Sequence, residues 1–397
     1  MSVELELTVL QQSDEELGYL AGLVVTDQMI VALGGVSNQA PTVLASSNAR
    51  NFQTRKTPRK RGLRDIIAVA DSIWACGEFG QLAVSKDHGA TWHKLDTRTD
   101  GCLFGLALAS DGALWVAGDG GYAARILGEG VRRIELDTTT RFTAVYAVRD
   151  DVVLLGADGQ LRRIRDSVPT VVPCGATKPL TGLCVTAKNT WIVVGDGGFC
   201  ARSPDGQWYS RAHIPTDADL ESIAMMADGT LVVVGDRGSI FVSRDDGRTW
   251  QPIASSLGGV HLWSVERFGG GMLIGGDGGL VAKLAPPGDA TWADRADVFG
   301  GGKQLDEVFA AGPEGFIENG LSQYLAAIAA DADADEDQDA DEDDDEDEDD
   351  DDDDAEVASD EDDDEDEDDE DEDEKEGEEE DLGIDEDEET EEEDWDE

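Results

Sequence analysis

The sequence predicts an all-β chain, a seven-bladed β-propeller of four-stranded blades followed by a short helix and a disordered acidic tail. Three observations support this prediction: turns of one kind recur at a nearly constant spacing, short apolar strands lie between them, and the composition changes abruptly at Asp331. The predicted segments are an N-terminal strand in 1–17, the propeller in 18–299, a linker with a helix in 300–330 and the tail in 331–397.

The recurring turns have the form glycine-acid-glycine and lie 38 to 42 residues apart. So narrow a spread over seven copies indicates a repeat architecture. The copies begin at Gly35 (degenerate), Gly77, Gly118, Gly156, Gly195, Gly235 and Gly276.

Each copy contains four predicted strands. A first apolar strand such as LFGLALAS precedes a denser one such as ALWVAG, and both are too short and too rich in β-branched residues for buried helices. Four short antiparallel strands in about forty residues are typical of a propeller blade. The alternating segment VELELTVL, residues 3–10, is a candidate partner for the last blade. Whether it closes the ring, and whether the blades number six, seven or eight, stays open at this point.

A second motif, Ser-x-Asp-x-Gly-x-Thr-Trp, follows the third strand of some copies. Its aspartate can accept hydrogen bonds from the backbone of the turn, and its glycine tolerates positive φ. These properties favour a structural role over acid catalysis. The motif residues are Ser85, Asp87, Gly89, Thr91, Trp92, Ser243, Asp245, Gly247, Thr249 and Trp250, with a shortened copy in Ser203, Asp205, Gly206 and Trp208.

This motif resembles the Asp-box, or BNR repeat, of sialidase-like propellers. Together with the glycine-acid-glycine turns it is similar to the propellers of the photosystem II assembly and stability factor family. The resemblance implies a propeller that serves as an interaction scaffold, with the boxes as structural hairpins at the rim. Sialidases also use an arginine triad, a tyrosine nucleophile with a glutamate partner and an early Arg-Ile-Pro motif, none of which is recognisable here. We therefore predict no catalytic residue.

No cofactor or metal site is predicted. The four histidines are too scattered for a zinc site, and the acidic repeat that begins at Asp331 lacks the central glycine of a calcium loop. The five cysteines are odd in number and lie in apolar runs, which favours buried free thiols in a reducing compartment. With no signal peptide or membrane-spanning run recognised, we expect a cytoplasmic protein without membrane contact.

The tail is the strongest functional signal in the sequence. Acids occupy 52 of its 67 positions, whereas residues 1–330 carry a net charge of only about −10. Such a polyanion stays extended, repels nucleic acid and attracts basic proteins. A merely solubilising tail is the alternative. Leu382, Ile384 and Trp395 interrupt the acids near the end and are candidates for a docking peptide.

Two further segments, a basic loop and a predicted helix, are candidates for binding. A basic loop between the first and second copies is interpreted as an exposed inter-blade connection, with a nuclear-import signal or a nucleic-acid patch as the alternatives. We hypothesise that the tail folds back onto this loop. An amphipathic helix in 314–330 either docks on the propeller or binds a partner. The basic residues are Arg55, Lys56, Arg59, Lys60 and Arg61.

The expected function is that of a monomeric, non-enzymatic scaffold or assembly factor whose tail engages basic protein partners. Two alternatives remain: a sialidase-like glycoside hydrolase in the propeller pocket, and an accessory or immunity-type protein that neutralises a cationic toxin.

Overall fold

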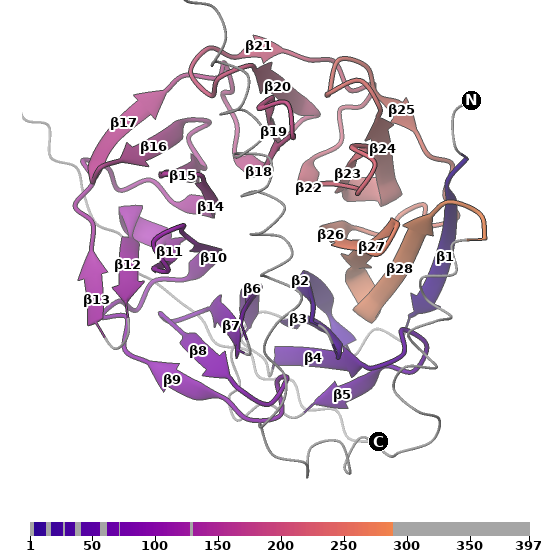
Figure 1. The fold of residues 1–397 in the computed structure, drawn as a ribbon, viewed down its shortest axis with the longest axis horizontal. Coiled ribbons are helices and arrows are strands. Elements are labelled where there is room, and N and C mark those ends of the chain that lie inside the picture. Colours follow the sequence, from indigo (N-terminus) through magenta and orange to yellow (C-terminus); the bar gives the residue numbers. More distant parts are fainter. Residues whose placement is uncertain are drawn as a thin grey trace, which may run out of the picture. The chain divides into compact units, whose positions relative to one another are not determined.

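The computed structural model describes residues 4–12, 17–26, 28–35, 41–55, 62–70, 72–127 and 130–288. They form seven four-stranded antiparallel sheets arranged as a ring (Figure 1), which confirms the predicted seven-bladed propeller. The predicted helix, the acidic tail and the residues Lys56, Arg59, Lys60 and Arg61 lie outside the described residues. The hypothesis that the tail covers the basic loop therefore stays a prediction.

In blades 1 to 6 the four strands follow one another in sequence from the centre of the ring outward. Blades 1 to 3 comprise β2 (Tyr19–Val25), β3 (Ile30–Gly35), β4 (Pro41–Ser46), β5 (Gln53–Arg55); β6 (Leu63–Val69), β7 (Ser72–Gly77), β8 (Leu82–Ser85), β9 (His93–Leu95); and β10 (Leu103–Leu108), β11 (Leu114–Gly118), β12 (Ala123–Leu127), β13 (Gly130–Arg133). Blades 4 to 6 comprise β14 (Phe142–Val148), β15 (Asp151–Gly156), β16 (Leu161–Arg165), β17 (Val168–Val172); β18 (Leu180–Val185), β19 (Trp191–Gly195), β20 (Phe199–Ser203), β21 (Ser210–Arg211); and β22 (Leu220–Met225), β23 (Leu231–Gly235), β24 (Ser239–Ser243), β25 (Gln251–Pro252).

Blade 7 is built from two distant parts of the chain. It contains β26 (Leu262–Phe268), β27 (Gly271–Gly276) and β28 (Leu280–Ala285), and its outermost strand is β1 (Glu6–Gln11). β1 runs antiparallel to β28, with Glu6 opposite Ala285 and Gln11 opposite Val281. This pairing closes the ring and leaves no gap between the first and last blades.

The core lies between neighbouring blades. Second strands such as β19 (WIVVG) and β23 (LVVVG) are buried along their whole length, because each face of the strand packs on an adjacent blade. One such cluster brings together Ile192, Leu220 and Trp250 from blades 5 and 6. This two-sided burial explains why these strands are continuously apolar rather than alternating.

Every innermost strand carries a β-bulge near its first residues, where the register to the second strand shifts by one. A bulge leaves one residue unpaired and re-aims its side chain. Because the bulge recurs in each blade, it creates seven equivalent positions around the ring. They are Ala21, Arg64, Phe104, Thr143, Thr181, Glu221 and Trp263.

The glycine-acid-glycine turns connect the second and third strands and join each blade to the next. In blade 3 the Gly121 amide donates to the Thr140 carbonyl at 3.0 Å, and in blade 6 the Gly238 amide donates to Val260 at 2.7 Å. Both glycines have φ near +67°, and a β-carbon on Gly121 would meet the Thr138 oxygen at 2.1 Å. The turns therefore require glycine both for their backbone angles and for the close approach of the next loop. We name the side of the ring formed by these turns and the inter-blade loops the turn face.

Candidate functional site

A row of stacked aromatic side chains begins on the turn face of blade 7 and continues into blade 1. The His261 imidazole stacks on the Trp263 indole, with ring centroids 3.9 Å apart and planes inclined by 19°. The Trp263 ring in turn lies 5.1 Å from the ring of Tyr19, the first residue of β2. All three side chains are half-buried, so the row remains accessible from solvent.

The row continues across blades 2 and 3 as alternating arginines and aromatic rings. The Arg64 guanidinium carbon lies 5.4 Å from the Tyr19 ring centroid and 5.9 Å from that of Phe104. Arg141 lies in the loop before blade 4, and its guanidinium carbon is 5.0 Å from the centroid of the same Phe104 ring. At these separations cation–π attraction supplements packing. We name the whole row, His261, Trp263, Tyr19, Arg64, Phe104 and Arg141, the ladder.

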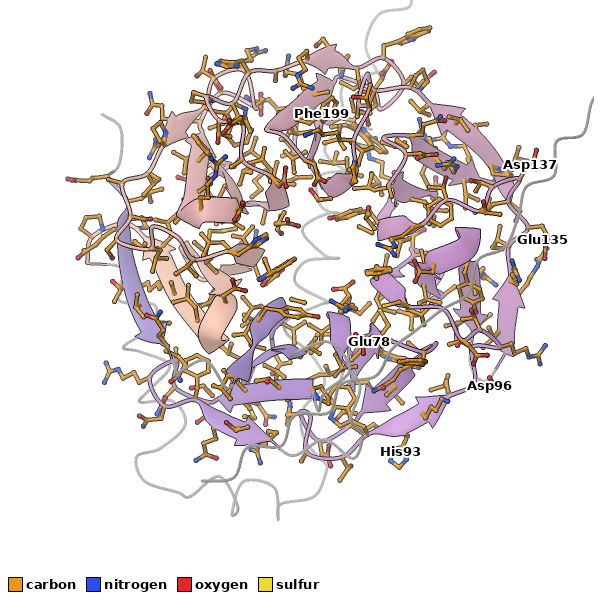
Figure 2. All side chains as sticks on the ribbon, turned by 180° about the vertical axis from the view of Figure 1, so that it is seen from behind. Glu78, His93, Asp96, Glu135, Asp137 and Phe199 are labelled. Carbon is orange, nitrogen blue, oxygen red and sulfur yellow. The ribbon has the colours of Figure 1, made fainter. Side chains whose placement is uncertain are left out.

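Carboxylates from the turns hold the arginines of the ladder in place. Arg64 pairs with Glu78 at 2.9 Å and also donates to the Tyr19 hydroxyl. Arg141 pairs with Asp119 at 2.6 Å. Figure 2 labels Glu78, which is buried in the turn of blade 2. The acids of the glycine-acid-glycine turns in blades 2 and 3 thus position arginines as well as forming turns.

Carboxylates also hold the aromatic side chains at the blade 7 end of the ladder. The Trp263 indole N–H donates to Asp277 at 2.8 Å. His261 Nε2 lies 3.1 Å from Glu221, and its Nδ1 lies 3.3 Å from Asp236. Burial lowers the pKa of His261, but the Glu221 hydrogen bond and the nearby carboxylates outweigh it and raise the pKa above its usual value. These carboxylates therefore stabilise the charged form of the imidazole.

Sequence reasoning did not find the ladder. Phe104 and Trp263 are apolar residues of predicted strands, and only the bulge turns them toward solvent instead of the core. One sequence signal pointed to it. An aromatic residue occupies the second position of the first strand in two copies, Phe104 in LFGL and Trp263 in LWSV.

The turn face of blades 4 and 5 lacks aromatic rungs. The Thr143 and Thr181 hydroxyls, at the equivalent bulge positions, donate to the Leu180 and Leu220 carbonyls of the following blades. These hydroxyls join neighbouring blades and offer no stacking surface.

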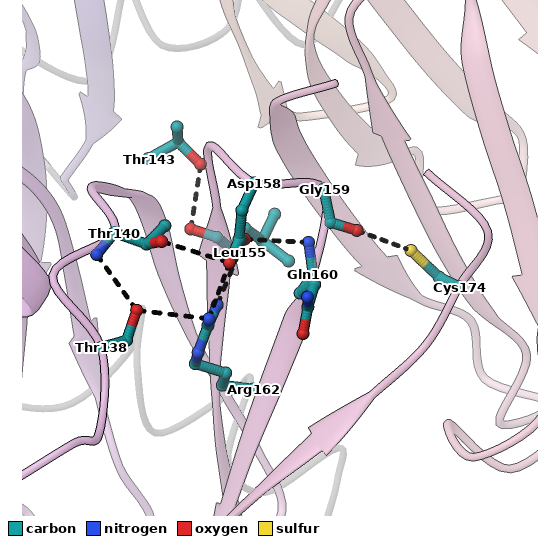
Figure 3. A network of polar contacts seen from close by, with 9 residues as sticks. All are labelled: Thr138, Thr140, Thr143, Leu155, Asp158, Gly159, Gln160, Arg162 and Cys174. Carbon is teal, nitrogen blue, oxygen red and sulfur yellow. Dashed lines mark hydrogen bonds and ion pairs between the residues drawn. The ribbon is translucent and has the colours of Figure 1, made fainter. Parts of the chain in front are cut away.

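The turn of blade 4 is held by a network of its own (Figure 3). Asp158 accepts from the Arg162 guanidinium at 2.7 and 3.2 Å and from the Thr140 hydroxyl at 3.2 Å. Arg162 also reaches the Thr138 hydroxyl, at 3.5 Å. With its guanidinium nearly buried and fully engaged, this arginine is structural.

Two carboxyl groups of the innermost strands are the candidates for acid–base chemistry. Asp65 accepts from the Leu106 amide of the next blade at 2.7 Å, and burial raises its pKa to about 7. Glu266 lies on the innermost strand β26, where desolvation by the surrounding strands raises its pKa to about 7 as well. Their raised pKa values suit proton transfer near neutral pH.

The Ser-x-Asp turns lie between third and fourth strands and hence on the ring face opposite the turn face. Asp245 accepts from the Thr249 amide at 2.8 Å and the Thr249 hydroxyl at 2.7 Å, while the Gly247 amide donates to Ser243 Oγ at 2.9 Å. Burial raises the pKa of Asp245, but these hydrogen bonds outweigh it and lower the pKa. Blade 2 repeats the arrangement around Asp87.

Two departures from the full motif are visible. In blade 1 an asparagine, Asn48, accepts from the Arg50 and Asn51 amides in place of the aspartate. In the shortened copy of blade 5 the Trp208 side chain is 78% exposed, whereas Trp250 of the full copy is 6% exposed. The indole of the shortened copy in blade 5 is therefore exposed, whereas the indole of the full copy in blade 6 is buried.

The cysteines and histidines form no site among the described residues. All five cysteines are free; Cys76, Cys174 and Cys200 are buried, but Cys102 and Cys184 are partly exposed, unlike the expected uniform burial. Burial raises the pKa of Cys102 to about 11 and that of Cys184 to about 12, so both stay protonated at neutral pH. No group of three metal-ligating side chains occurs in the part of the chain that the structure describes.

Of the remaining sequence-predicted residues, one lies on an outer strand and the others fall outside the described residues. Arg55 ends β5 and is partly buried, whereas Leu382, Ile384 and Trp395 fall outside the described ranges. Over those same ranges, no helix is long and apolar enough to cross a membrane.

No protein-family model and no curated protein sequence matches this chain. Solved structures, in contrast, resemble its fold. Inactive virginiamycin B lyase from Staphylococcus aureus with quinupristin has 15% sequence identity and a TM-score of 0.64, over 71% of this chain and 99% of the lyase. The WD40 β-propeller domain of Doa1 has 13% identity and a TM-score of 0.62, over 74% and 100% of the two chains.

A structure of YCF48 bound to D1 peptide has 13% identity and a TM-score of 0.58, over 71% of this chain and 94% of that one. Likeness at such low identity concerns the fold alone, because one propeller architecture carries many activities. The chain is thus a seven-bladed β-propeller, similar in fold to a lyase, to a WD40 domain and to a peptide-bound YCF48.

Proposed function

We propose that this chain is a non-enzymatic, cytoplasmic interaction scaffold or assembly factor whose turn face binds a segment of another polypeptide. The ladder carries this proposal, because aromatic and arginine side chains dominate binding hot spots. Carboxylates hold Arg64, Arg141 and Trp263 in one arrangement, so these side chains lose little entropy on binding. The peptide-bound YCF48 and the WD40 domain of the same fold support the proposal.

The test is an array of nine-residue peptides of varied sequence, probed with the full chain. We expect Phe104→Ala, which removes the central aromatic rung of the ladder, to abolish most of the binding seen with the wild type. Trp208→Ala is the matched control, since Trp208 is an exposed aromatic on the opposite face. Unchanged binding by Phe104→Ala, or equal losses in both variants, would contradict the proposal.

We also propose that the Ser-x-Asp turns are Asp-boxes. The Ser-x-Asp turns of blades 2, 5 and 6 are Asp-boxes in the structural sense, supported by their hydrogen bonds. Because sialidase-like propellers carry the same boxes, it is the lack of a recognisable sialidase arginine triad that supports a scaffold propeller of the photosystem II assembly type. The chain acts as a monomer.

The acidic tail adds a second binding element for basic proteins. Its 52 acids supply a negative field that accelerates encounters with cationic surfaces and weakens with salt. The probe is cytochrome c, a cationic protein, in titrations from about 20 to 300 mM salt. Replacing the acids of 331–397 by their amides in the full chain should remove the salt-sensitive binding. Equal binding by both forms would take the tail out of the mechanism.

A hydrolase in the channel is the second candidate, and the raised pKa values of Asp65 and Glu266 favour it. Its test is hydrolysis of fluorogenic glycosides and sialosides by the full chain. Activity that Glu266→Gln abolishes, and that Asp96→Asn at the exposed rim leaves intact, would replace the scaffold proposal. We expect no turnover.

A further inference from the structure

The charges of the turn face are balanced on one side of the ring and unbalanced on the other. The two arginines of the ladder are paired, Arg64 with Glu78 and Arg141 with Asp119. Blades 5 and 6 instead bring together three acids, Asp196, Asp219 and Glu221, whose neighbouring cations are Lys178 and His261. Asp219 accepts from the Gly197 amide at 2.7 Å, which fixes it beside the turn that carries Asp196.

These three acids repel one another. Burial, together with the charges of Asp219 and Glu221, raises the pKa of Asp196 to about 6, and Lys178 offsets only part of that effect. A carboxylate whose pKa is raised this far lies in a net negative potential, which Lys178 and the His261 imidazole offset only in part. A cation entering this place would relieve the repulsion, whereas an anionic ligand would increase it.

The acids are continuous with the ladder. Glu221 occupies the bulge position of blade 6 and lies 3.1 Å from His261, whose ring stacks on Trp263. A ligand side chain that contacts Glu221 is therefore separated from the accessible Trp263 indole only by the His261 ring. The aromatic surface and the negative potential together form one extended surface across blades 5, 6, 7, 1, 2 and 3.

We propose that this surface binds polypeptide segments in which a lysine or arginine lies beside aromatic or large apolar residues, with the cation at Asp196, Asp219 and Glu221 and the apolar side chains on the ladder. This inference rests on the proposed scaffold function and specifies its partner. Cation and aromatic contacts would reinforce each other, because a cation near an indole gains cation–π attraction as well as charge attraction. Acidic segments are excluded by the same potential.

The experiment measures fluorescence anisotropy of three labelled nine-residue peptides with the full chain at about 300 mM salt, which screens the tail. The first peptide carries Lys between Phe and Leu, the second has acetyl-lysine at that position, and the third has Ser in place of Phe and Leu. We expect each change to weaken binding roughly tenfold, which corresponds to about 1.4 kcal/mol.

Asp196→Asn is the informative variant, because the Asp196 side chain is not part of the hydrogen bonds that build the turn. It should weaken binding of the lysine peptide about fivefold and leave the acetyl-lysine peptide unchanged. Asp150→Asn is the matched control: it removes the same charge from the exposed turn between β14 and β15 on the opposite face.

Two failures are distinguishable. If the acetyl-lysine peptide binds as tightly as the lysine peptide, or if Asp196→Asn and Asp150→Asn behave alike, the cationic partner is wrong while the scaffold function stands. If Phe104→Ala binds every peptide like the wild type, or if no peptide binds below about 1 mM, both the partner and the ladder site are wrong.

Discussion

Gly121 and Thr138 approach each other so closely between blades 3 and 4 that a β-carbon on Gly121 would lie 2.1 Å from the Thr138 carbonyl oxygen. Equivalent contacts recur at Gly198 and Thr216, also 2.1 Å, and at Gly238 and Leu257, 2.3 Å. The repeat is therefore visible in the sequence because these blades need a glycine where the next loop crosses the turn.

Replacing this glycine should destabilise the propeller strongly. Gly121→Ala would force the backbone apart in addition to the strain of φ +68°, and we expect a loss of about 3 kcal/mol or more. Gly112→Ala is the control, because Gly112 has φ +78° but nothing within 4 Å of a β-carbon; it should lose only about 1 kcal/mol. Urea unfolding monitored by circular dichroism measures both. Equal losses would show that close approach contributes nothing.

His261 should make stability depend on pH. Its folded pKa is raised, so its contribution is present below the unfolded pKa of about 6.5 and is lost as the pH rises through the folded value. Relative to His261→Gln, the wild type should lose roughly 0.5 kcal/mol of unfolding free energy between pH 6 and 9, since solvent screens a half-buried group.

The control for this titration is His93→Gln. His93 is an exposed residue of the outer strand β9 (Figure 2), so its replacement should leave the pH profile of the wild type intact. A His261→Gln profile parallel to that of the wild type would show that Glu221 and Asp236 do not hold the imidazolium.

The motif tryptophans should differ sharply despite their common sequence position. Trp250→Ala removes a buried indole from the core between blades 5 and 6, and about 3 to 5 kcal/mol should be lost. Trp208→Ala should change stability by less than about 0.5 kcal/mol, because that side chain is largely in solvent.

Trp250→Phe refines this test. The buried Trp250 Nε1 has no hydrogen-bond partner among the described residues, so phenylalanine sacrifices volume but no polar contact. We expect it to recover more than half of the stability lost in Trp250→Ala, measured by the same urea unfolding. A phenylalanine variant as unstable as alanine would mean that the shape of the indole, and not its apolar area, is what the core needs.

The fold was predictable because its causes are local. Asp245 and Gly247 act within one turn, and Gly121 marks a position repeated at almost constant intervals. Blade closure by β1 was less visible, since VELELTVL alternates like any half-buried strand and its partner is more than 270 residues away.

The ladder was not predictable for a different reason. Tyr19 meets Trp263, and Arg64 links Tyr19 to Phe104, only because the ring brings the first strands of separate blades together and a bulge turns Phe104 and Trp263 outward. No spacing in the sequence encodes these contacts. The acid of each turn was noticed in the sequence, but its arginine or indole partner could be identified only in three dimensions.

The pairing of β1 with β28 imposes an order on biosynthesis. The strand that completes blade 7 is made first, yet its partner leaves the ribosome only some 270 residues later, roughly 15 to 55 s at ordinary elongation rates. During that interval the Glu6–Gln11 segment has an unpaired edge, which is a template for pairing with other nascent chains. Glu6 and Gln11 keep the two ends of that edge polar, and the intramolecular pairing with β28 competes with concentration-dependent pairing between chains until the last blade has been made.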